Sequence, residues 1–206
     1  MLFTRARKND FPPEIHFHDG SLIDVVSETK LLGVIITDNL KWNKNTEFLC
    51  LKARQKLWTL KRMMLLDLDE YELFDVYKKE IRSILEYAAP VWHSGLTRKE
   101  NSEIESVQKL AFRMILKKGY DSYSRACAYF QTDTLYKRRL EICKRFAIKN
   151  LNSHNCMFEV ISQDTRLRNR PVKVKEFKCN TSQYQKSSLP FLAKIINQTG
   201  LKGTLS

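Results

Sequence analysis

The sequence predicts an α+β fold, in which a short antiparallel β unit precedes a mainly helical bundle. Short runs rich in Val, Ile and Phe, broken by turn residues, are confined to the first forty residues. From Trp42 onward, apolar residues recur at spacings of three and four. The formal charge also changes, from −2 over residues 1–40 to +15 over residues 41–206. We therefore divide the chain into a β segment, a helical bundle and a basic, partly irregular tail, over 1–42, 43–152 and 153–206.

Length, charge and composition limit the classes to which this protein can belong. The chain has 206 residues, with 36 Lys and Arg against 23 Asp and Glu, which gives a formal charge of +13. Hydrophobic residues make up 43% of it, enough apolar material for a core, and this excludes a wholly disordered chain. The surplus of positive charge favours an anionic partner, most often nucleic acid.

The sequence gives no support to membrane or secreted classes. No window of 18 apolar residues occurs, and residues 1–10 lack the apolar core of a signal peptide. The five cysteines are odd in number and far apart, which argues against a disulfide framework. We therefore expect no membrane partner and an intracellular, reducing compartment, with nucleus and cytoplasm left open.

Four short extended runs make up the β segment. They are residues 1–6, 14–18, 22–26 and 30–36. Asp19-Gly20 separates the second run from the third, and this dipeptide between extended runs predicts a hairpin. Asp38-Asn39 predicts a further turn. So few strands do not close a sheet, so we expect this segment to pack against either the helices or a piece outside this chain.

The first two helices are predicted by an apolar stripe and by a capping signal. One helix spans about 45–66, and its inward stripe is Cys50, Ala53, Leu57, Leu60 and Met64. The second begins at Asp69, because Asp69 and Glu72 have the spacing of a capping box. We expect it to continue until Pro90, which lacks the backbone N–H that a helix interior needs.

The later helices complete an expected antiparallel bundle of four long helices. The third begins at Thr97, which forms a second capping-box pair with Glu100, and Gly119 is expected to stop it. A short helix over 123–130 and a fourth long helix over 135–151 follow, and residues 190–198 form a last helical stretch. Residues 166–178 are expected to be extended.

Basic side chains gather on the predicted outer faces of these helices. They are Lys52, Lys56 and Arg62 on the first helix, Lys109, Arg113 and Lys117 on the third, and Lys137, Arg138, Arg139, Lys144 and Arg145 on the fourth. The tail adds Arg166, Arg168 and Arg170. Such side chains can neutralise phosphates and release counterions, which makes binding salt-dependent. The alternative is that these cations simply face solvent, as they do on most amphipathic helices.

No self-contained catalytic or metal site is predicted. The cysteines lack C-x-x-C spacing, and the phosphate-binding glycine motifs and G-x-S-x-G are absent. His16 and His18 share one face of a strand beside Asp19, but solvated histidines near a turn are the simpler interpretation. Asp67 and Asp69 invite comparison with a carboxylate pair, yet Asp69 is better explained as a helix cap.

Four blocks of the chain carry a family resemblance. The first is Lys30-Leu31-Leu32-Gly33-Val34-Ile35-Ile36 followed by Leu40-Lys41-Trp42, and the second is the run from Leu85 to Thr97. The third is Val107-Gln108-Lys109 with Ala111, Arg113 and Ile115, and the fourth is Arg168-Asn169-Arg170 followed by Tyr184, Lys186-Ser187, Leu189-Pro190-Phe191 and Asn197. In this order they resemble the carboxy-terminal part of reverse transcriptases from non-LTR retrotransposons, the jockey-like, LINE-type elements.

The resemblance implies an RNA-directed DNA polymerase of a mobile element. In that family the segment that matches Leu31 to Val34 belongs to the primer-grip hairpin, which makes Leu32 and Gly33 candidates for contact with nucleic acid. The helices that follow form the thumb, which holds the template–primer duplex. The family often has a His three residues after the Trp, whereas this chain has Asn45, so a role for that position does not carry over.

The catalytic palm of that family, with its Tyr-x-Asp-Asp turn and the Mg²⁺ that it holds, has no counterpart in this sequence. We therefore expect a carboxy-terminal fragment that holds no cofactor of its own and lacks an upstream palm domain. At most it would bind RNA, DNA or an RNA–DNA hybrid through the phosphate backbone. The alternatives are a non-enzymatic basic helical protein, a functionless retroelement relic, and an accessory subunit for a separately encoded palm.

Overall fold

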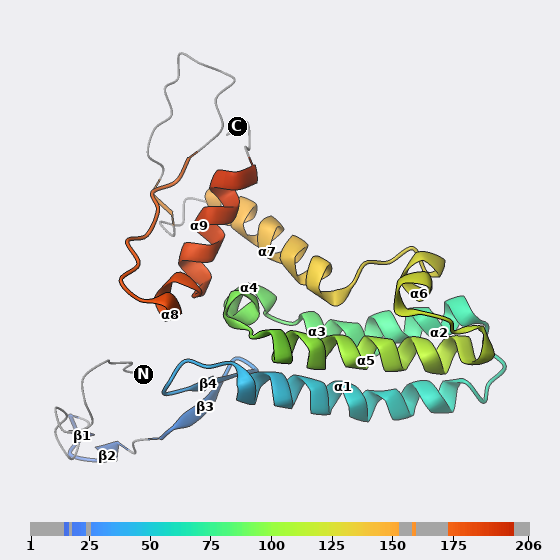
Figure 1. The fold of residues 1–206 in the computed structure, drawn as a ribbon. Helices are drawn as coiled ribbons and strands as arrows, with labels where there is room; N and C mark the ends of the chain where they lie inside the picture. The colour runs from blue at the N-terminus through green and yellow to red at the C-terminus, as the bar shows by residue number, and fades with distance from the viewer. Residues whose placement is uncertain (1–14, 17, 24–25, 153–157, 160–172, 200–206) are drawn as a thin grey trace.

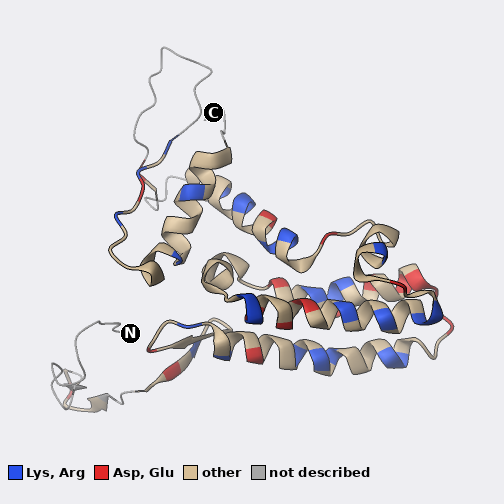
Figure 2. Cartoon of the chain, viewed as in Figure 1, with Lys and Arg blue, Asp and Glu red and all other residues tan. Residues whose placement is uncertain are grey.

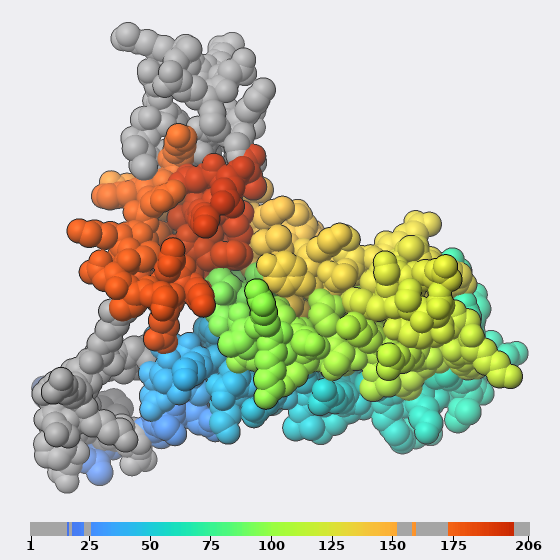
Figure 3. Space-filling view, in the orientation of Figure 1, coloured from blue at the N-terminus to red at the C-terminus, as the bar shows by residue number. Residues whose placement is uncertain are grey.

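Two small antiparallel sheets precede a set of helices, which confirms the predicted α+β class. Figure 1 shows this arrangement in the computed structural model, which describes residues 15–16, 18–23, 26–152, 158–159 and 173–199. Three helical rods lie side by side and form a bundle, while the last helices rise from one of its ends, as the space-filling view in Figure 3 also shows.

The first sheet is the hairpin predicted at Asp19-Gly20. Strand β1 (Ile15–His16) pairs antiparallel with β2 (Leu22–Ile23). Asp19 Oδ1 accepts a hydrogen bond of 2.9 Å from the backbone N–H of Ser21, and Gly20 has φ of +82°, a conformation that glycine adopts without strain. Local turn chemistry is therefore sufficient to explain this hairpin.

The second sheet corrects the prediction of one strand over 30–36. Strand β3 (Glu28–Leu31) pairs antiparallel with β4 (Val34–Thr37), and the chain reverses at Leu32-Gly33. Both turn residues have positive φ, +46° and +82°, which matches the twist that short hairpin loops need. Leucine gives no local signal for this conformation, so the continuous apolar run concealed the turn.

Contacts with the helices hold this second hairpin in place. Val34 is buried, and the backbone N–H of Ile35 donates a hydrogen bond of 3.1 Å to Asn45 Oδ1. The hydroxyl of Tyr87 donates one of 2.8 Å to the carbonyl of Leu32. The described β3–β4 hairpin therefore packs on the helical part, which was one of the two expected alternatives, and Asn45 has a structural role there.

Helix α1 (Asn43–Met63) buries the predicted stripe from Cys50 to Leu60 and ends a little before the predicted boundary. Helix α2 (Glu70–Tyr77) begins with the predicted capping box of Asp69 and Glu72. The chain continues through a π-helical turn, η2 (Lys78–Arg82), into α3 (Ser83–Glu86).

Pro90 begins a helix instead of ending one. The rod formed by α2, η2 and α3 stops at Tyr87, because Ala88 adopts a left-handed conformation with φ of +50°. Pro90 then lies in the first turn of α4 (Ala89–Trp92), where its missing N–H is not needed, and the 3₁₀ turn η3 (His93–Gly95) follows. The prediction that Pro90 ends the second helix is therefore wrong.

The next helices begin where the sequence predicted, but one ends differently. Helix α5 (Arg98–Leu116) has the predicted capping box of Thr97 and Glu100. It ends because Lys117 turns to φ of +48°, whereas Gly119 only closes the 3₁₀ turn η4 (Lys117–Gly119). The remaining helices are α6 (Tyr123–Tyr129), α7 (Leu135–Asn152), α8 (Ser182–Gln185) and α9 (Ser188–Thr199).

The main core lies between α1, the α2–η2–α3 rod and α5. Its centre is aromatic, and the ring centroids of Phe74 and Phe130 are 4.3 Å apart while those of Tyr77 and Phe112 are 5.5 Å apart. Such contacts add to the free energy gained from the buried apolar area. The three rods therefore form one packed unit.

The fourth long helix departs from the expected four-helix bundle. Near its start, α7 contributes Leu135 and Ile142 to the main core. Its later residues Cys143 and Ala147 join a second cluster with α9, and Val174 completes this cluster. Small side chains on α7 allow the apolar face of α9 to pack closely there. The bundle proper thus has three rods, and α7 links it to α9.

A chain of hydrogen bonds that begins in the core connects four helices. The Tyr77 hydroxyl donates to Gln108 Oε1 over 2.6 Å, and Gln108 Nε2 donates to the Tyr123 hydroxyl over 2.9 Å. The Tyr123 hydroxyl in turn donates to Glu105. The Glu105 carboxylate also accepts the backbone N–H of Tyr136 over 2.7 Å, in the first turn of α7. This chain orients α6 and α7 on α5.

A buried arginine fastens α7 to the α4 region. Arg139 is fully buried, although the sequence placed it on a basic outer face, and that expectation is wrong. Its Nη2 donates to Asn101 Oδ1 over 2.8 Å, and its Nε donates to Nδ1 of buried His93 over 3.5 Å. Its guanidinium also lies 5.7 Å from the ring centroid of Trp92. The pattern of charges cannot reveal this burial, because three basic residues follow one another at 137–139.

Gly95 supports the packing of Trp42, and replacing it should destabilise the fold. A Cβ at Gly95 would lie 2.4 Å from Trp42 Cδ1, whereas one at Gly119 would meet no atom within 4 Å. We expect Gly95→Ala to lower the free energy of unfolding by about 1–3 kcal/mol. Gly119→Ala, also in a 3₁₀ turn, should change it by less than about 0.5 kcal/mol. Urea unfolding followed by circular dichroism measures both, and equal midpoints for the two variants would contradict the close contact.

His93 should make the fold sensitive to acid. Burial, and secondly the charge of Arg139, lowers the pKa of His93 from its ordinary value of 6.5 to about 4. Between pH 6.5 and about 4, His93 therefore binds a proton in the unfolded chain but not in the folded chain. The contribution of neutral His93 to the free energy of unfolding is fully present above pH 6.5 and decreases as the pH falls toward 4. The loss amounts to at most about 3 kcal/mol.

The check is urea unfolding from pH 7.5 to 4. His93→Asn should flatten the dependence of the unfolding free energy on pH, because an asparagine side chain does not titrate. His18→Asn replaces an exposed histidine and should leave the dependence as in the wild type. The same pH dependence in wild type and His93→Asn would refute the assignment.

Candidate nucleic-acid interface

Helix α1 has an exposed apolar stripe on the side away from the core. Leu51 and Trp58 are seven residues apart on α1, and their exposed fractions are 59% and 61%. Seven residues make about two helical turns, so the two side chains lie along one line, which we call the α1 stripe. Leu65, also exposed, follows in the turn after α1 ends at Met63. Reasoning from the sequence missed this stripe because it sought only the inward face. The seven-residue spacing was the signal that could have revealed it.

Cations flank the α1 stripe on both sides. On the side of α5, Arg54 Nη2 donates a hydrogen bond of 3.4 Å to Ser106 Oγ. On the side of η2, Lys56 Nζ lies 2.8 Å from Glu80 Oε2. Arg62 lies within the stripe, with its guanidinium 4.8 Å from the ring centroid of Trp58. The apolar line therefore has a cation on each of its sides.

The basic face of α5 continues this surface. Figure 2 shows Lys and Arg recurring along α1 and α5, which lie side by side. Arg113 is exposed and falls on the same helical face as Ser106, the residue that Arg54 contacts, and exposed Lys117 follows at the end of α5. The cations of α5 rest on aromatic rings, since Lys109 Nζ lies 5.2 Å from the ring centroid of Tyr123 and the Arg113 guanidinium lies 5.3 Å from that of Tyr120.

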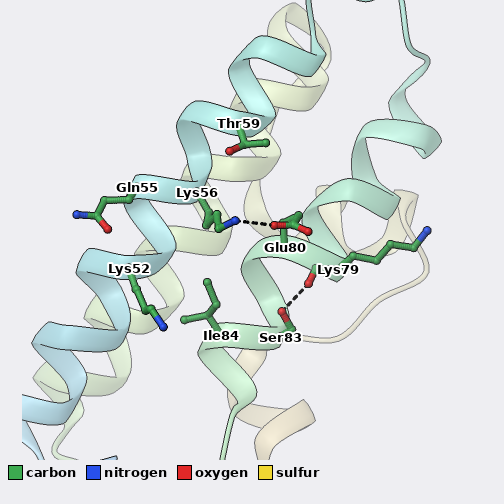
Figure 4. A pocket seen from close by; sticks show the side chains of 8 residues that line it. All are labelled: Lys52, Gln55, Lys56, Thr59, Lys79, Glu80, Ser83 and Ile84. Atoms are coloured by element: carbon green, nitrogen blue, oxygen red, sulfur yellow. Dashed lines mark hydrogen bonds and ion pairs between the residues drawn. The ribbon is translucent and has the colours of Figure 1, made fainter. Parts of the chain in front are cut away.

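A groove of about 490 Å³ opens between α1 and η2. Figure 4 shows its residues: Lys52 and Lys56 project from α1, and Glu80 projects from η2 to meet Lys56. Ile84 lies between the two helices, while the ammonium group of Lys79 points away from the groove. The two lysines that the sequence singled out on the first helix therefore line one concave site.

The predicted cations of α7 are divided between two environments. Arg138 donates two hydrogen bonds to Glu86, of 2.5 and 3.2 Å, and so joins α7 to α3. This engagement leaves it a poor candidate for a phosphate contact. Arg145 is exposed, in the later part of α7 that packs on α9. The tail candidates Arg166, Arg168 and Arg170 lie outside the described residues.

The candidates Leu32 and Gly33 lie at the tip of the β3–β4 hairpin. The Leu32 side chain is 84% exposed. A Cβ at Gly33 would lie 3.2 Å from Cε1 of Tyr87, so the close neighbour of Gly33 is this ring. The prediction of one strand over 30–36 placed Gly33 in the interior of that strand. The turn position and the Tyr87 ring account for this glycine instead.

The described residues offer no donor set for a metal ion. They contain no group of three or more His, Cys, Asp or Glu placed to hold one. His18 lies in the turn after β1, so it does not share a strand face with His16 as predicted. Asp69 caps α2, as expected.

Two buried thiols are also unsuited to chemistry. Burial raises the pKa of Cys50 to about 11 and that of Cys143 to about 12. The reactive form of cysteine is the thiolate, so both thiols are inert at neutral pH.

Comparison with known proteins assigns no family to the chain. No protein-family model, no curated protein and no solved structure matches the chain. Among the residues that the structure describes, no helix is both long and apolar enough to cross a membrane.

Proposed function

We propose that this chain is the thumb-like part of a reverse transcriptase of the non-LTR retrotransposon type, and that it holds a template–primer duplex. The observation that carries the proposal is the α1 stripe with cations on both of its sides. Four blocks of sequence in the family's order, the hairpin at Leu32-Gly33 and the helices after it support the same assignment.

A nucleic-acid duplex is complementary to this surface. Its minor groove has sugar edges between two rows of phosphates, and an RNA–DNA hybrid offers a wide, shallow version of that groove. The α1 stripe can cover the sugars with Leu51 and Trp58, while Arg54 faces one strand and Lys52 the other. Binding of this kind reads shape and charge, so it is indifferent to base sequence.

The proposed function is holding a duplex and not copying it. Phosphoryl transfer needs groups that stabilise the charge that develops on the reacting phosphate, usually Mg²⁺ held by carboxylates. The described residues contain no such donor set. The carboxylates Glu86 and Glu105 instead accept hydrogen bonds from α7, and Glu80 pairs with Lys56.

Duplex binding should be steeply salt-dependent and should require Trp58. We expect the affinity of the chain for a short RNA–DNA hybrid to fall roughly a hundredfold or more between about 50 and 200 mM salt. Trp58→Ala should weaken binding about five- to thirtyfold at each salt concentration, because it removes apolar contact area. The salt slope should not change, since Trp58 carries no charge. Fluorescence anisotropy with a labelled hybrid measures both quantities.

Tyr136→Ala is the matched control, because it removes an exposed aromatic side chain from α7, outside the α1 stripe. It should bind as the wild type does. An affinity that is the same at low and high salt would contradict the proposal. It would favour the alternative in which the basic faces are only solvated. Loss of binding in Tyr136→Ala as large as in Trp58→Ala would show that the α1 stripe is not the contact.

A further inference from the structure

The groove between α1 and η2 contains a lysine that is already neutralised. Lys56 Nζ lies 2.8 Å from Glu80 Oε2, and both side chains are about half exposed. An exposed pair of this kind contributes little to stability, because water and salt screen it. The pair nevertheless neutralises Lys56, one of the cations beside the α1 stripe. Glu80 is therefore a carboxylate inside a basic surface. It affects the affinity of this surface for an anion more than it affects the stability of the fold.

Lys52 lies one helical turn before Lys56 and faces the same groove (Figure 4). Like charges four residues apart on a helix repel each other. An anion bound between Lys52 and Lys56 would therefore attract both ammonium groups and reduce their repulsion. Among the described residues Lys52 forms no ion pair, and its ammonium group lies 5.6 Å from the ring centroid of Phe48. A single phosphate is large enough to meet two lysines at this spacing, but Glu80 holds one of them.

The packing of the core places Glu80 beside α1. Tyr77, Ile81 and Leu85 are all fully buried. Residues spaced by four lie on one face of a helix, so these three side chains turn that face toward the core. Glu80 precedes Ile81 and is thereby held at the edge that borders α1. The core packing thus fixes the carboxylate beside the groove.

We propose that the α1–η2 groove is a site for one backbone phosphodiester of the bound nucleic acid, and that Glu80 occupies its place in the free protein. This inference rests on the proposed function, because it places one strand of the duplex on the η2 side of the α1 stripe. Binding exchanges the carboxylate for a phosphate on Lys56 and adds Lys52. The carboxylate remains nearby and weakens the contact, so Glu80 limits the affinity of the surface.

The test compares two variants that both remove one carboxylate and free one lysine. Glu80→Gln releases Lys56 in the groove, while Asp75→Asn releases Lys78, which pairs with Asp75 on α2 outside the groove. For Glu80→Gln we expect hybrid binding about two- to fivefold tighter at about 0.1 M salt. We also expect a salt slope steeper by about 0.9. Asp75→Asn should match the wild type, and adding Lys56→Ala to Glu80→Gln should cancel the gain.

Equal gains from Glu80→Gln and Asp75→Asn would overturn the inference, since net charge alone would then explain them. A gain that persists without Lys56 would overturn it as well. Thermal unfolding of each variant, followed by circular dichroism, confirms that the fold is retained.

A second measurement separates this inference from the proposed function. Inorganic pyrophosphate is titrated into the wild type, Glu80→Gln and Asp75→Asn, and the side-chain resonances of Lys52 and Lys56 are followed by NMR. Both lysines should shift more in Glu80→Gln than in the other two proteins. If they do so while the wild type binds no hybrid, the duplex proposal fails and the anion site remains. If the wild type binds hybrid but neither lysine shifts in Glu80→Gln, the groove inference fails alone.

Discussion

The arrangement of the helices depends on satisfying a few buried polar groups. Leaving a buried hydroxyl or amide without a partner costs about 1–3 kcal/mol, a large share of the stability of a small domain. Once Tyr77 and Gln108 are buried between the rods, Tyr123 on α6 and Glu105 on α5 must complete the chain of hydrogen bonds. Glu105 then holds the first turn of α7. One polar chain inside an apolar core thus orients helices that are distant in sequence.

The same packing divides the positive charge of the chain between interior and surface. The net charge of +13 measures only the total. Arg139 is inside the molecule and Arg138 is paired with Glu86, so neither adds to a basic face. Exposed cations remain on α1 and α5, where aromatic rings support several of them. The charge pattern therefore favoured an anionic partner in principle, but it could not say which helices would meet that partner.

The candidate surface has an apolar centre, the α1 stripe, and a charged border. Helix α1 carries apolar residues on two faces. Its inward stripe, from Cys50 to Leu60, packs in the main core. Its outward stripe has no partner among the described residues. A solvated basic helix has no need of an exposed tryptophan in line with an exposed leucine. This line is the physical ground for the proposal that the surface holds a duplex, and in that proposal the groove beside it takes a phosphate of one strand.

The sequence by itself determined the features that local chemistry controls. The capping boxes at Asp69 and Thr97, the hairpin at Asp19-Gly20 and the periods of the helices were all predictable, because each depends on residues a few positions apart. Only the tertiary structure decided the turn at Leu32 and the helix break at Ala88. Positive φ costs energy at these residues. At Leu32 the hydroxyl of Tyr87, which is distant in sequence, donates a hydrogen bond to the backbone carbonyl. Beside Ala88, Nε1 of Trp92, whose side chain is buried in the core, donates one of 2.9 Å to the carbonyl of Tyr87. The burial of Arg139 and the pairing of Lys56 with Glu80 were likewise beyond the sequence, because both depend on which helices come together.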